Sequence, residues 1–358
     1  MTPMSSIVST YSLGAASLSA MAQTQSQVSV LTVESSSGEY ADLGVQLGEQ
    51  SGYELSLRSQ VDQMQTLTTA NNLTVTNLTT AQDAINSMTS TAQSAVETLT
   101  SLSAGSDTAA ATLQNTGTNG LQELIQNANT SSSGQYLFGG VNSGAAPLTN
   151  YSSTTAGQTA FDNAFQSAFN CSPTSASVST ISSSDMQSFL TGWFSDQFSG
   201  TNWSGDSTTS GNWSSASSTN VTTEILPGET ATTSTNANGA GFQQLAEGYA
   251  MLSQLVGLSL SASAQQTLIS TASSLINQGI SSMNDTEATL GTTQTQVTDA
   301  NTSMSNQLTI LQTQIGNLDD VDSEKVATQL SSLQTQLETA YELTAQLQKM
   351  SLAQYLPT

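Results

Sequence analysis

The sequence contains almost no basic residues. Its 358 residues include three Lys or Arg against 26 Asp or Glu, which gives a formal net charge of -23. The three are Arg58, Lys325 and Lys349. Binding to a nucleic-acid backbone or to an anionic lipid surface needs several basic side chains close together. No such patch can form, so we expect neither nucleic acid nor a membrane as a partner.

Histidine is absent, and Cys171 is the single cysteine. The sequence therefore has no intrachain disulfide framework, no imidazole to activate the thiol, and none of the commonest metal ligand. Acid–base chemistry would depend on carboxylates alone. We predict no catalytic residue, no metal site and no cofactor, and we interpret Cys171 as a small, inert side chain.

Charged residues of all kinds make up only 8% of the chain and aromatic residues 5%, compared with roughly 25% charged residues in typical proteins. No apolar run approaches the roughly 20 residues of a membrane-spanning helix, and the N-terminus lacks the basic and apolar regions of a cleaved signal peptide. We expect a protein that is cytosolic or is exported without signal cleavage.

Composition and periodicity divide the chain into paired segments. Residues 1–56 with 321–358 are predicted to form terminal assembly helices, and residues 57–130 with 242–320 a rod of long helices. Residues 131–241 are rich in Ser, Thr, Gly and Asn and are predicted to form a variable, surface-exposed insert. The predicted fold is mainly α: an elongated antiparallel coiled-coil bundle of the N- and C-terminal segments, with a small β-rich or irregular central insert.

Two long stripes of apolar residues carry the fold prediction. Alternating steps of four and three residues from Leu57 to Leu99 meet nine apolar residues in thirteen positions, and the same steps from Ile276 to Leu318 meet ten. This spacing is typical of a coiled-coil interface. The two windows have equal length, so we expect the stripes to face each other. A third element near Leu113 and Leu121 is expected to pack against them.

Shorter stripes of the same kind occupy both ends of the chain. The residues between the apolar positions of these stripes have only a moderate tendency to form helices, and the shortage of Lys and Arg precludes ion pairs between successive turns. Packing against other helices must therefore stabilise these segments as helices. Asp322 or Ser323 is predicted to cap the last helix. The residues predicted to make assembly contacts are Ile7, Leu18, Val28, Leu333, Leu337 and Leu347.

The predicted insert contains all three tryptophans, Trp193, Trp203 and Trp213, at intervals of ten residues. An Asn-Trp-Ser triplet occurs at the second and third of them. This repetition suggests short strands joined by Gly and Ser turns. The alternative is a flexible, low-complexity loop anchored by its aromatic residues.

Three groups of residues could carry chemistry. An acidic run could suggest calcium, but it lacks the glycine and glutamate positions of a calcium loop and is better interpreted as a helix cap. A glycine group lacks the lysine of a phosphate loop and predicts a turn. Three carboxylates of the insert are the only candidates for the pair of carboxyl groups that a glycosidase uses. The acidic run is Asp319, Asp320, Asp322 and Glu324. The glycine group is Gly139, Gly140 and Gly144. The three carboxylates are Asp206, Glu224 and Glu229.

Three stretches resemble a known family, the bacterial flagellar hook-filament junction proteins, also called hook-associated protein 3, within the flagellin superfamily. Residues 37–61, SGEYADLGVQLGEQSGYELSLRSQV, are similar to the turn and second-helix entry of these proteins. Residues 134–151, GQYLFGGVNSGAAPLTNY, resemble the signature at which the helical part meets the insert. Residues 337–356, LETAYELTAQLQKMSLAQYL, are similar to the C-terminal helix.

The resemblance implies a structural subunit that is exported through the flagellum without signal cleavage, assisted by a flagellar export chaperone. It would polymerise outside the cell at the hook tip and join hook to filament. Its partners would be further copies of itself, other hook-associated proteins and flagellin. One alternative is flagellin itself, the main filament subunit. Another, of a different class, is adhesin or hydrolase activity in the insert.

Overall fold

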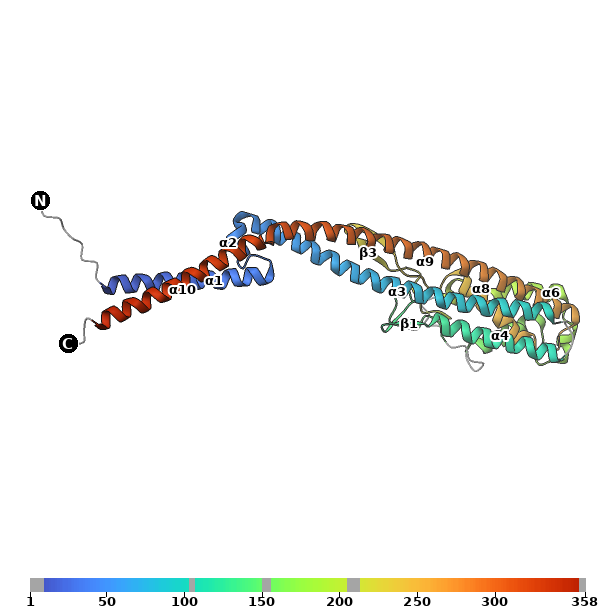
Figure 1. The fold of residues 1–358 in the computed structure, drawn as a ribbon. Coiled ribbons are helices and arrows are strands. Elements are labelled where there is room, and N and C mark those ends of the chain that lie inside the picture. Colours follow the sequence, from blue (N-terminus) through green and yellow to red (C-terminus); the bar gives the residue numbers. More distant parts are fainter. Residues whose placement is uncertain (1–9, 103–106, 150–155, 205–212, 354–358) are drawn as a thin grey trace. The chain divides into compact units, whose positions relative to one another are not determined.

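The computed structural model describes residues 10–102, 107–149, 156–204 and 213–353, and most of them are helical (Figure 1). The chain divides into two compact units. We call residues 1–65 with 305–358 the terminal unit, and residues 66–304 the central unit. Two long helices, α3 (Ser51–Ser101) and α9 (Ala262–Asp319), contribute to both units. The predicted mainly α fold, built from long helices of both chain halves, is confirmed.

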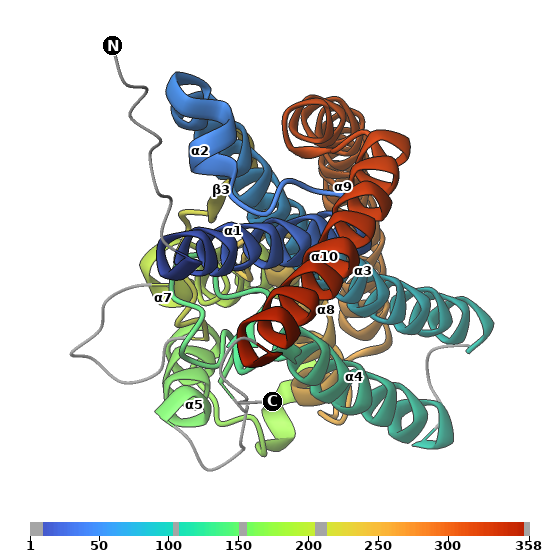
Figure 2. The ribbon, with the colours of Figure 1, turned by 60° about the vertical axis from the view of Figure 1, so that its left-hand side comes forward.

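The terminal unit contains α1 (Thr10–Ser37), α2 (Leu43–Leu47), the 3-10 helix η1 (Gly48–Gln50), the start of α3, the end of α9, and α10 (Ser323–Ala353). Helices α1 and α10 lie side by side (Figure 2). Ser17 Oγ lies 3.4 Å from Thr344 Oγ1, and Gln25 donates a hydrogen bond to Tyr341. Residue numbers rise along α1 as those of their partners fall along α10, so the two helices are antiparallel.

Backbone and side-chain groups fix the helix ends in the terminal unit. Helix α1 ends at Ser37 and is followed by Gly38, whose φ of 79° is readily adopted by glycine. The carbonyl of Gly38 accepts a hydrogen bond of 2.8 Å from the Val321 N–H. Asp322 Oδ1 accepts 3.1 Å hydrogen bonds from the N–H groups of Glu324 and Lys325. The predicted cap of the last helix is therefore confirmed, with Asp322 as the capping residue.

In the central unit, α3 and α9 pair antiparallel along the predicted stripes. Asn71 Nδ2 donates to Asn301 Oδ1 at 2.9 Å, and Gln82 Nε2 donates to Gln294 Oε1 at 2.9 Å. Both pairs join positions of the two predicted stripes, which therefore face each other here as expected. The buried apolar members of the stripes in this unit are Leu78, Ile85, Ala92, Leu99, Ile276, Met283, Leu290, Val297 and Met304.

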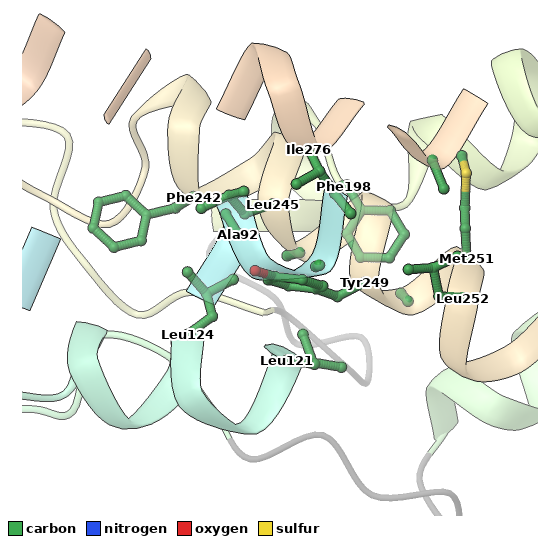
Figure 3. Packing of buried hydrophobic residues seen from close by; sticks show 14 of the residues in the cluster. Ala92, Leu121, Leu124, Phe198, Phe242, Leu245, Tyr249, Met251, Leu252 and Ile276 are labelled. Carbon is green, nitrogen blue, oxygen red and sulfur yellow. The ribbon is translucent and has the colours of Figure 1, made fainter. Parts of the chain in front are cut away.

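Helix α4 (Asp107–Ala128) packs against α8 (Ala240–Leu255) at very short range. A Cβ atom on Gly120 would lie 2.4 Å from Cε1 of Tyr249, so only glycine fits beneath this ring. Figure 3 shows Tyr249 facing Leu121 and Leu124 of α4. Both leucines, with Leu113, are buried in one core that α3, α4, α8 and α9 share. The predicted third packing element is thus α4.

Between α4 and α8 the chain forms mostly short helices. They are α5 (Ala156–Phe169), the 3-10 helix η2 (Ala176–Thr180), α6 (Ser183–Phe189), the π-helical turn η3 (Leu190–Phe194) and α7 (Gly200–Ser204). The buried aromatic residues of this segment, Phe161, Phe165, Phe189, Phe194, Phe198 and Trp203, belong to the same core as the long helices; Phe198 lies in the turn between η3 and α7. This segment is therefore packed against the helices, which argues against the alternative of a flexible loop.

The tryptophan repeat does not define strands, and that part of the prediction is wrong. Trp193 lies in η3 and Trp203 in α7, while Trp213 stacks on Trp203 with ring centroids 5.9 Å apart. Helical steps of four and five residues bring Phe189, Trp193 and their neighbours onto one cluster, so packing between helices accounts for the aromatic positions.

Two small antiparallel hairpins supply the strands of the insert. Strand β1 (Ser131–Ser132) pairs with β2 (Gln135–Tyr136), with Ser131 opposite Tyr136. Strand β3 (Thr222–Leu226) pairs with β4 (Glu229–Thr232), with Thr223 opposite Ala231. The second hairpin buries Ile225 and Ala231 against Val297 and Ala300 of α9. The prediction was a small β-rich or irregular central insert, and the two hairpins confirm that the insert contains β-structure.

Candidate functional site

Exposed apolar side chains gather in the terminal unit. Nine of the twelve large apolar side chains that are exposed among the described residues belong to it, although it is the smaller unit. They are Leu18, Val30, Val33, Val45, Tyr53, Leu55, Ile310, Tyr341 and Leu343. Single exposed apolar residues are ordinary, but their concentration in one part of a protein indicates an interaction surface.

The contact between α1 and α10 is thin. Among the described side chains of these two helices, the buried apolar ones are Met21 on α1 and Val326 on α10. Leu31, Leu330 and their neighbours are only half-buried. An open hollow of about 760 Å³ lies between the helices and is lined by Val30, Leu31, Val326 and Leu333, among others. The pair therefore retains apolar surface that another helix could cover.

The predicted assembly residues differ in how exposed their side chains are, and two of these side chains are not among those described. Leu18 is 61% exposed, whereas Val28, Leu333 and Leu337 are half-buried on the α1 and α10 pair. Ile7 lies outside the described residues. Leu347 lies within α10, but its side chain is not among those described. Their role in assembly stays a prediction.

Sequence reasoning missed several exposed apolar residues that the structure places in the same unit. Val30 and Val33 follow each other at a helical step of three, outside the single stripe that was traced through residues 7–28. Tyr341 and Leu343 likewise lie beside the stripe on α10. A search for a second apolar stripe on each helix would have found them, because helices that contact more than one neighbour carry more than one apolar face.

The only arginine of the chain binds two buried carboxylates in the terminal unit. Arg58 Nη2 donates to Asp319 Oδ2 at 2.5 Å, and Arg58 also forms an ion pair with Glu54 one helical turn before it. Asp319 is 1% exposed and Glu54 is buried as well. Hydrogen bonding to Glu54, and then to Asp319, raises the pKa of Arg58 although partial burial acts against it. These contacts tie the start of α3 to the end of α9.

Several of the glycines and carboxylates that could carry chemistry have structural roles. Gly139 and Gly140 form a tight turn, as predicted: a Cβ on Gly140 would lie 2.5 Å from the Ser217 carbonyl oxygen. Glu224 Oε1 accepts a hydrogen bond of 2.8 Å from the Gly228 N–H, and Glu229 Oε1 accepts one of 3.3 Å from Gln296 Nε2. Both carboxylates thus stabilise the β3–β4 hairpin. Cys171 is buried, and Asp206 lies outside the described residues.

None of the described helices combines the length and the apolar character needed to cross a bilayer. Helices with thin mutual packing are typical of subunits whose terminal segments gain stability from neighbours.

Two family models match the chain at its two ends. The model of the bacterial flagellin N-terminal helical region matches residues 8–143, and the model of the bacterial flagellin C-terminal helical region matches residues 273–356. Together they cover more than half of the sequence, in the order and positions that the helices of both units occupy. The chain belongs to the flagellin family.

Flagellin-family membership makes the protein a structural subunit of the bacterial flagellum, an extracellular organelle of motility. The family is structural and non-enzymatic. The matched regions end at residue 143 and resume at residue 273, so the short helices and the β3–β4 hairpin lie outside them. No curated protein matches the chain.

Proposed function

We propose that this flagellin-family protein is the hook-filament junction subunit, which polymerises at the distal end of the hook and joins the hook to the filament. The observation that carries the proposal is the segment at residues 134–151, whose sequence resembles the junction-protein signature and of which the structure describes residues 134–149. Phe138 in this segment is fully buried and meets Phe242 edge-on, with ring centroids 5.3 Å apart.

Close packing gives this signature a physical basis. The carbonyl of Asn142 would lie 2.6 Å from a Cβ on Gly139, and Gly140 adopts a φ of 59° against Ser217. Substitution at either glycine would push the turn away from the core. The segment thus connects α4 to the insert through residues that cannot be exchanged freely.

Assembly is proposed to use the terminal unit. Each copy would cover the exposed and half-buried apolar side chains of another copy, including Leu18, Val28, Leu333 and Leu337. Ile7 and Leu347 are proposed to extend the same contacts. Burying one such side chain contributes about 1.5–3 kcal/mol when it starts fully exposed. Several half-exposed side chains per helix are enough to drive helix association while leaving the isolated pair marginal.

The remaining parts of the proposal follow from the same properties. Terminal helices that are marginal alone would pass through the export channel of the flagellum unfolded, without a cleaved signal, and a dedicated export chaperone would cover their apolar stripes in the cell. Partners after export would be other hook-associated proteins and flagellin.

The location and number of copies in the flagellum test this proposal. Antibody labelling of isolated flagella should place the protein as a short layer at the hook tip, with a few copies each. A strain lacking the protein should make hooks and release flagellin into the medium. Labelling along the whole filament, with thousands of copies, would instead assign the protein as the main filament subunit. That second candidate is supported by the family match at both ends.

A truncation and two point variants test the role of the terminal unit. Deleting residues 339–358 should abolish assembly and leave export intact. Leu333→Asp and Leu337→Asp should weaken assembly, because each adds a charge to an apolar contact, whereas Gln334→Glu on the exposed face should not. A truncated protein that still attaches filaments to hooks would refute the assignment.

A further inference from the structure

A hollow in the central unit is lined by residues of α6, η3, α8 and α9. It has a volume of about 370 Å³, more than the roughly 150 Å³ of a cavity that holds benzene. A small molecule would therefore fit. We call it the Glu247 hollow, because Glu247 of α8 is the one ionisable residue among the described residues that line it.

Glu247 is a buried acid for which its own unit has no counter-charge. The residue is only 7% exposed. Residues 66–304 contain no Lys, Arg or His, since Arg58, Lys325 and Lys349 all belong to the terminal unit. A buried carboxylate is costly unless a positive charge lies beside it. A cation that neutralises Glu247 must therefore come from outside the central unit.

The hydroxyl groups of the hollow present hydrogen-bond acceptors. Five hydroxyl side chains line it, and four of them already donate their hydrogen to the protein. Thr191 Oγ1 and Ser270 Oγ each donate to a backbone carbonyl at 2.9 Å. Thr271 Oγ1 donates to a glutamine side-chain oxygen at 3.3 Å, and Ser195 donates to Glu247. Because a hydroxyl oxygen keeps two lone pairs, this lining suits a ligand that donates hydrogen bonds.

The donor set favours an alkylammonium ion over a metal ion. A hard divalent cation binds several carboxylate or carbonyl oxygens, whereas the hollow offers a single carboxylate. No group of three or more His, Cys, Asp or Glu that could hold a metal occurs among the described residues. Leu190 and Leu275 add an apolar wall that suits a short hydrocarbon chain. A primary ammonium group supplies one positive charge and three N–H donors.

We propose that the Glu247 hollow binds a small primary alkylammonium ion. Its charge would pair with the Glu247 carboxylate, and its N–H groups would donate to the surrounding hydroxyl oxygens. Three of the four elements that form the hollow, α6, η3 and α8, lie outside the residues that the flagellin models match. The site would therefore be a property of this chain and not of the family, and it does not depend on the proposed junction role.

Binding should strengthen as pH rises, because the ion pairs with the ionised carboxyl group. Burial raises the pKa of Glu247 to about 7, so about a tenth of these groups are ionised at pH 6 and about nine tenths at pH 8. An alkylammonium ion stays protonated at both values, as a lysine with a pKa of about 10.4 does. The apparent affinity should therefore be about tenfold higher at pH 8 than at pH 6.

Other charged groups near α8 do not supply a cation. No charged side chain of α6, η3 or α9 is among the described residues that line the hollow. On the α4 side of α8, Glu123 helps to raise the pKa of Tyr249. Asp185 and Asp196 flank the segment that covers the hollow, and both are exposed. All of these groups are acidic or neutral, so they favour the entry of a cation.

The probe is propylammonium chloride, added to the purified full-length chain at pH 8 in phosphate buffer without other amines. It should raise the midpoint of urea unfolding, followed by tryptophan fluorescence, more than equal concentrations of sodium chloride or tetramethylammonium chloride do. Sodium chloride controls for ionic strength, and tetramethylammonium has the charge and methyl groups but no N–H donor. The dependence on concentration gives the apparent affinity, which should fall about tenfold at pH 6.

Three variants locate the site. Glu247→Gln keeps the shape of the side chain, removes its charge and should abolish the advantage of propylammonium over sodium. Thr191→Val removes one acceptor and should weaken binding about tenfold. Asp285→Asn removes an exposed carboxylate of α9 outside the hollow and should respond as the unaltered chain does. Saturation-transfer NMR of propylammonium reports contact directly and does not depend on the stability of a variant.

Three outcomes would overturn the inference: equal midpoints in propylammonium and tetramethylammonium at pH 8, an unchanged response in Glu247→Gln, or equal affinities at pH 6 and pH 8. Stabilisation by sodium as strong as that by propylammonium would also overturn it, because any small cation would then suffice. None of these results bears on the proposed function, which is judged by location at the hook tip.

Discussion

Glu247 on α8 is a buried carboxyl group without a basic partner, and its replacement gives a sharp test of the central core. The residue is 7% exposed. It borders a hollow of about 370 Å³ whose other lining residues, among them Ser195 and Thr191, are uncharged. Burial raises the pKa of Glu247 from 4.5 to about 7, and hydrogen bonding from Ser195 offsets this only in part.

The sign of the pH effect follows from this shift. The folded protein binds the Glu247 proton more tightly than the unfolded chain does, so the free energy of unfolding falls as pH rises from about 4.5 to about 7 and then levels off. One pKa unit corresponds to about 1.4 kcal/mol, so the loss at pH 8 is about 3 kcal/mol. Glu247→Gln keeps a polar, neutral side chain and should remove this loss.

Urea unfolding of the unaltered chain and of Glu247→Gln should be compared from pH 5 to pH 8. Tryptophan fluorescence is a suitable signal because all three tryptophans lie in the central unit. Between pH 5 and pH 8 the variant should gain about 2.5 kcal/mol relative to the unaltered chain, because the first part of the loss has already occurred at pH 5. Asp83→Asn, which removes an exposed carboxylate of α3, serves as the control and should show no such gain. A pH-independent difference between Glu247→Gln and the unaltered chain would refute the reasoning.

Three further predictions concern packing and polar pairs, each measured by thermal unfolding with circular dichroism. Gly120→Ala should destabilise the protein by about 2 kcal/mol, because the new Cβ would lie 2.4 Å from an aromatic ring of α8. Gly291→Ala, with no atom within 4 Å, should be neutral or stabilise α9. Arg58→Gln should cost about 3 kcal/mol in the terminal unit, because buried Asp319 loses its charge partner. Asn71→Leu should cost about 1–3 kcal/mol, because its partner amide on α9 and a backbone carbonyl of β3 lose their donor. An unchanged melting temperature of Gly120→Ala, Arg58→Gln or Asn71→Leu would contradict the corresponding prediction.

The long helices could be predicted from the sequence because their packing is periodic. Positions such as Ile85 and Val297 repeat at the same step over many turns, and the structure buries both against the facing helix or hairpin. The start of the last helix, α10, was also predictable, because the first backbone N–H groups of any helix lack a partner within the helix and the carboxylate of Asp322 accepts hydrogen bonds from them.

The insert could not be predicted in the same way because its contacts are not periodic. Spacing alone placed Trp203 in a strand, whereas its fully buried ring and its hydrogen bond of 3.1 Å to the Ala237 carbonyl depend on chain segments that meet only in the fold. Glu247 is a similar case. Nothing in its sequence neighbourhood distinguishes it from an exposed helical glutamate, and only the packing of η3 and α9 over α8 makes it a buried acid.

The long helices α3 and α9 can form a stable pair despite the near absence of basic residues, because hydrogen bonds between neutral side-chain amides replace ion pairs along their contact. Arg58 is the only basic residue in the first 324 positions. In the central unit the pairing positions hold Asn71 with Asn301 and Gln82 with Gln294. Each such hydrogen bond contributes only about 0.5–1.5 kcal/mol, but sliding one helix along the other would place these amides against apolar side chains at a cost of about 1–3 kcal/mol each. The amides therefore fix the register of α3 against α9 independently of salt and of pH, which an ion-pair network on so acidic a chain could not do.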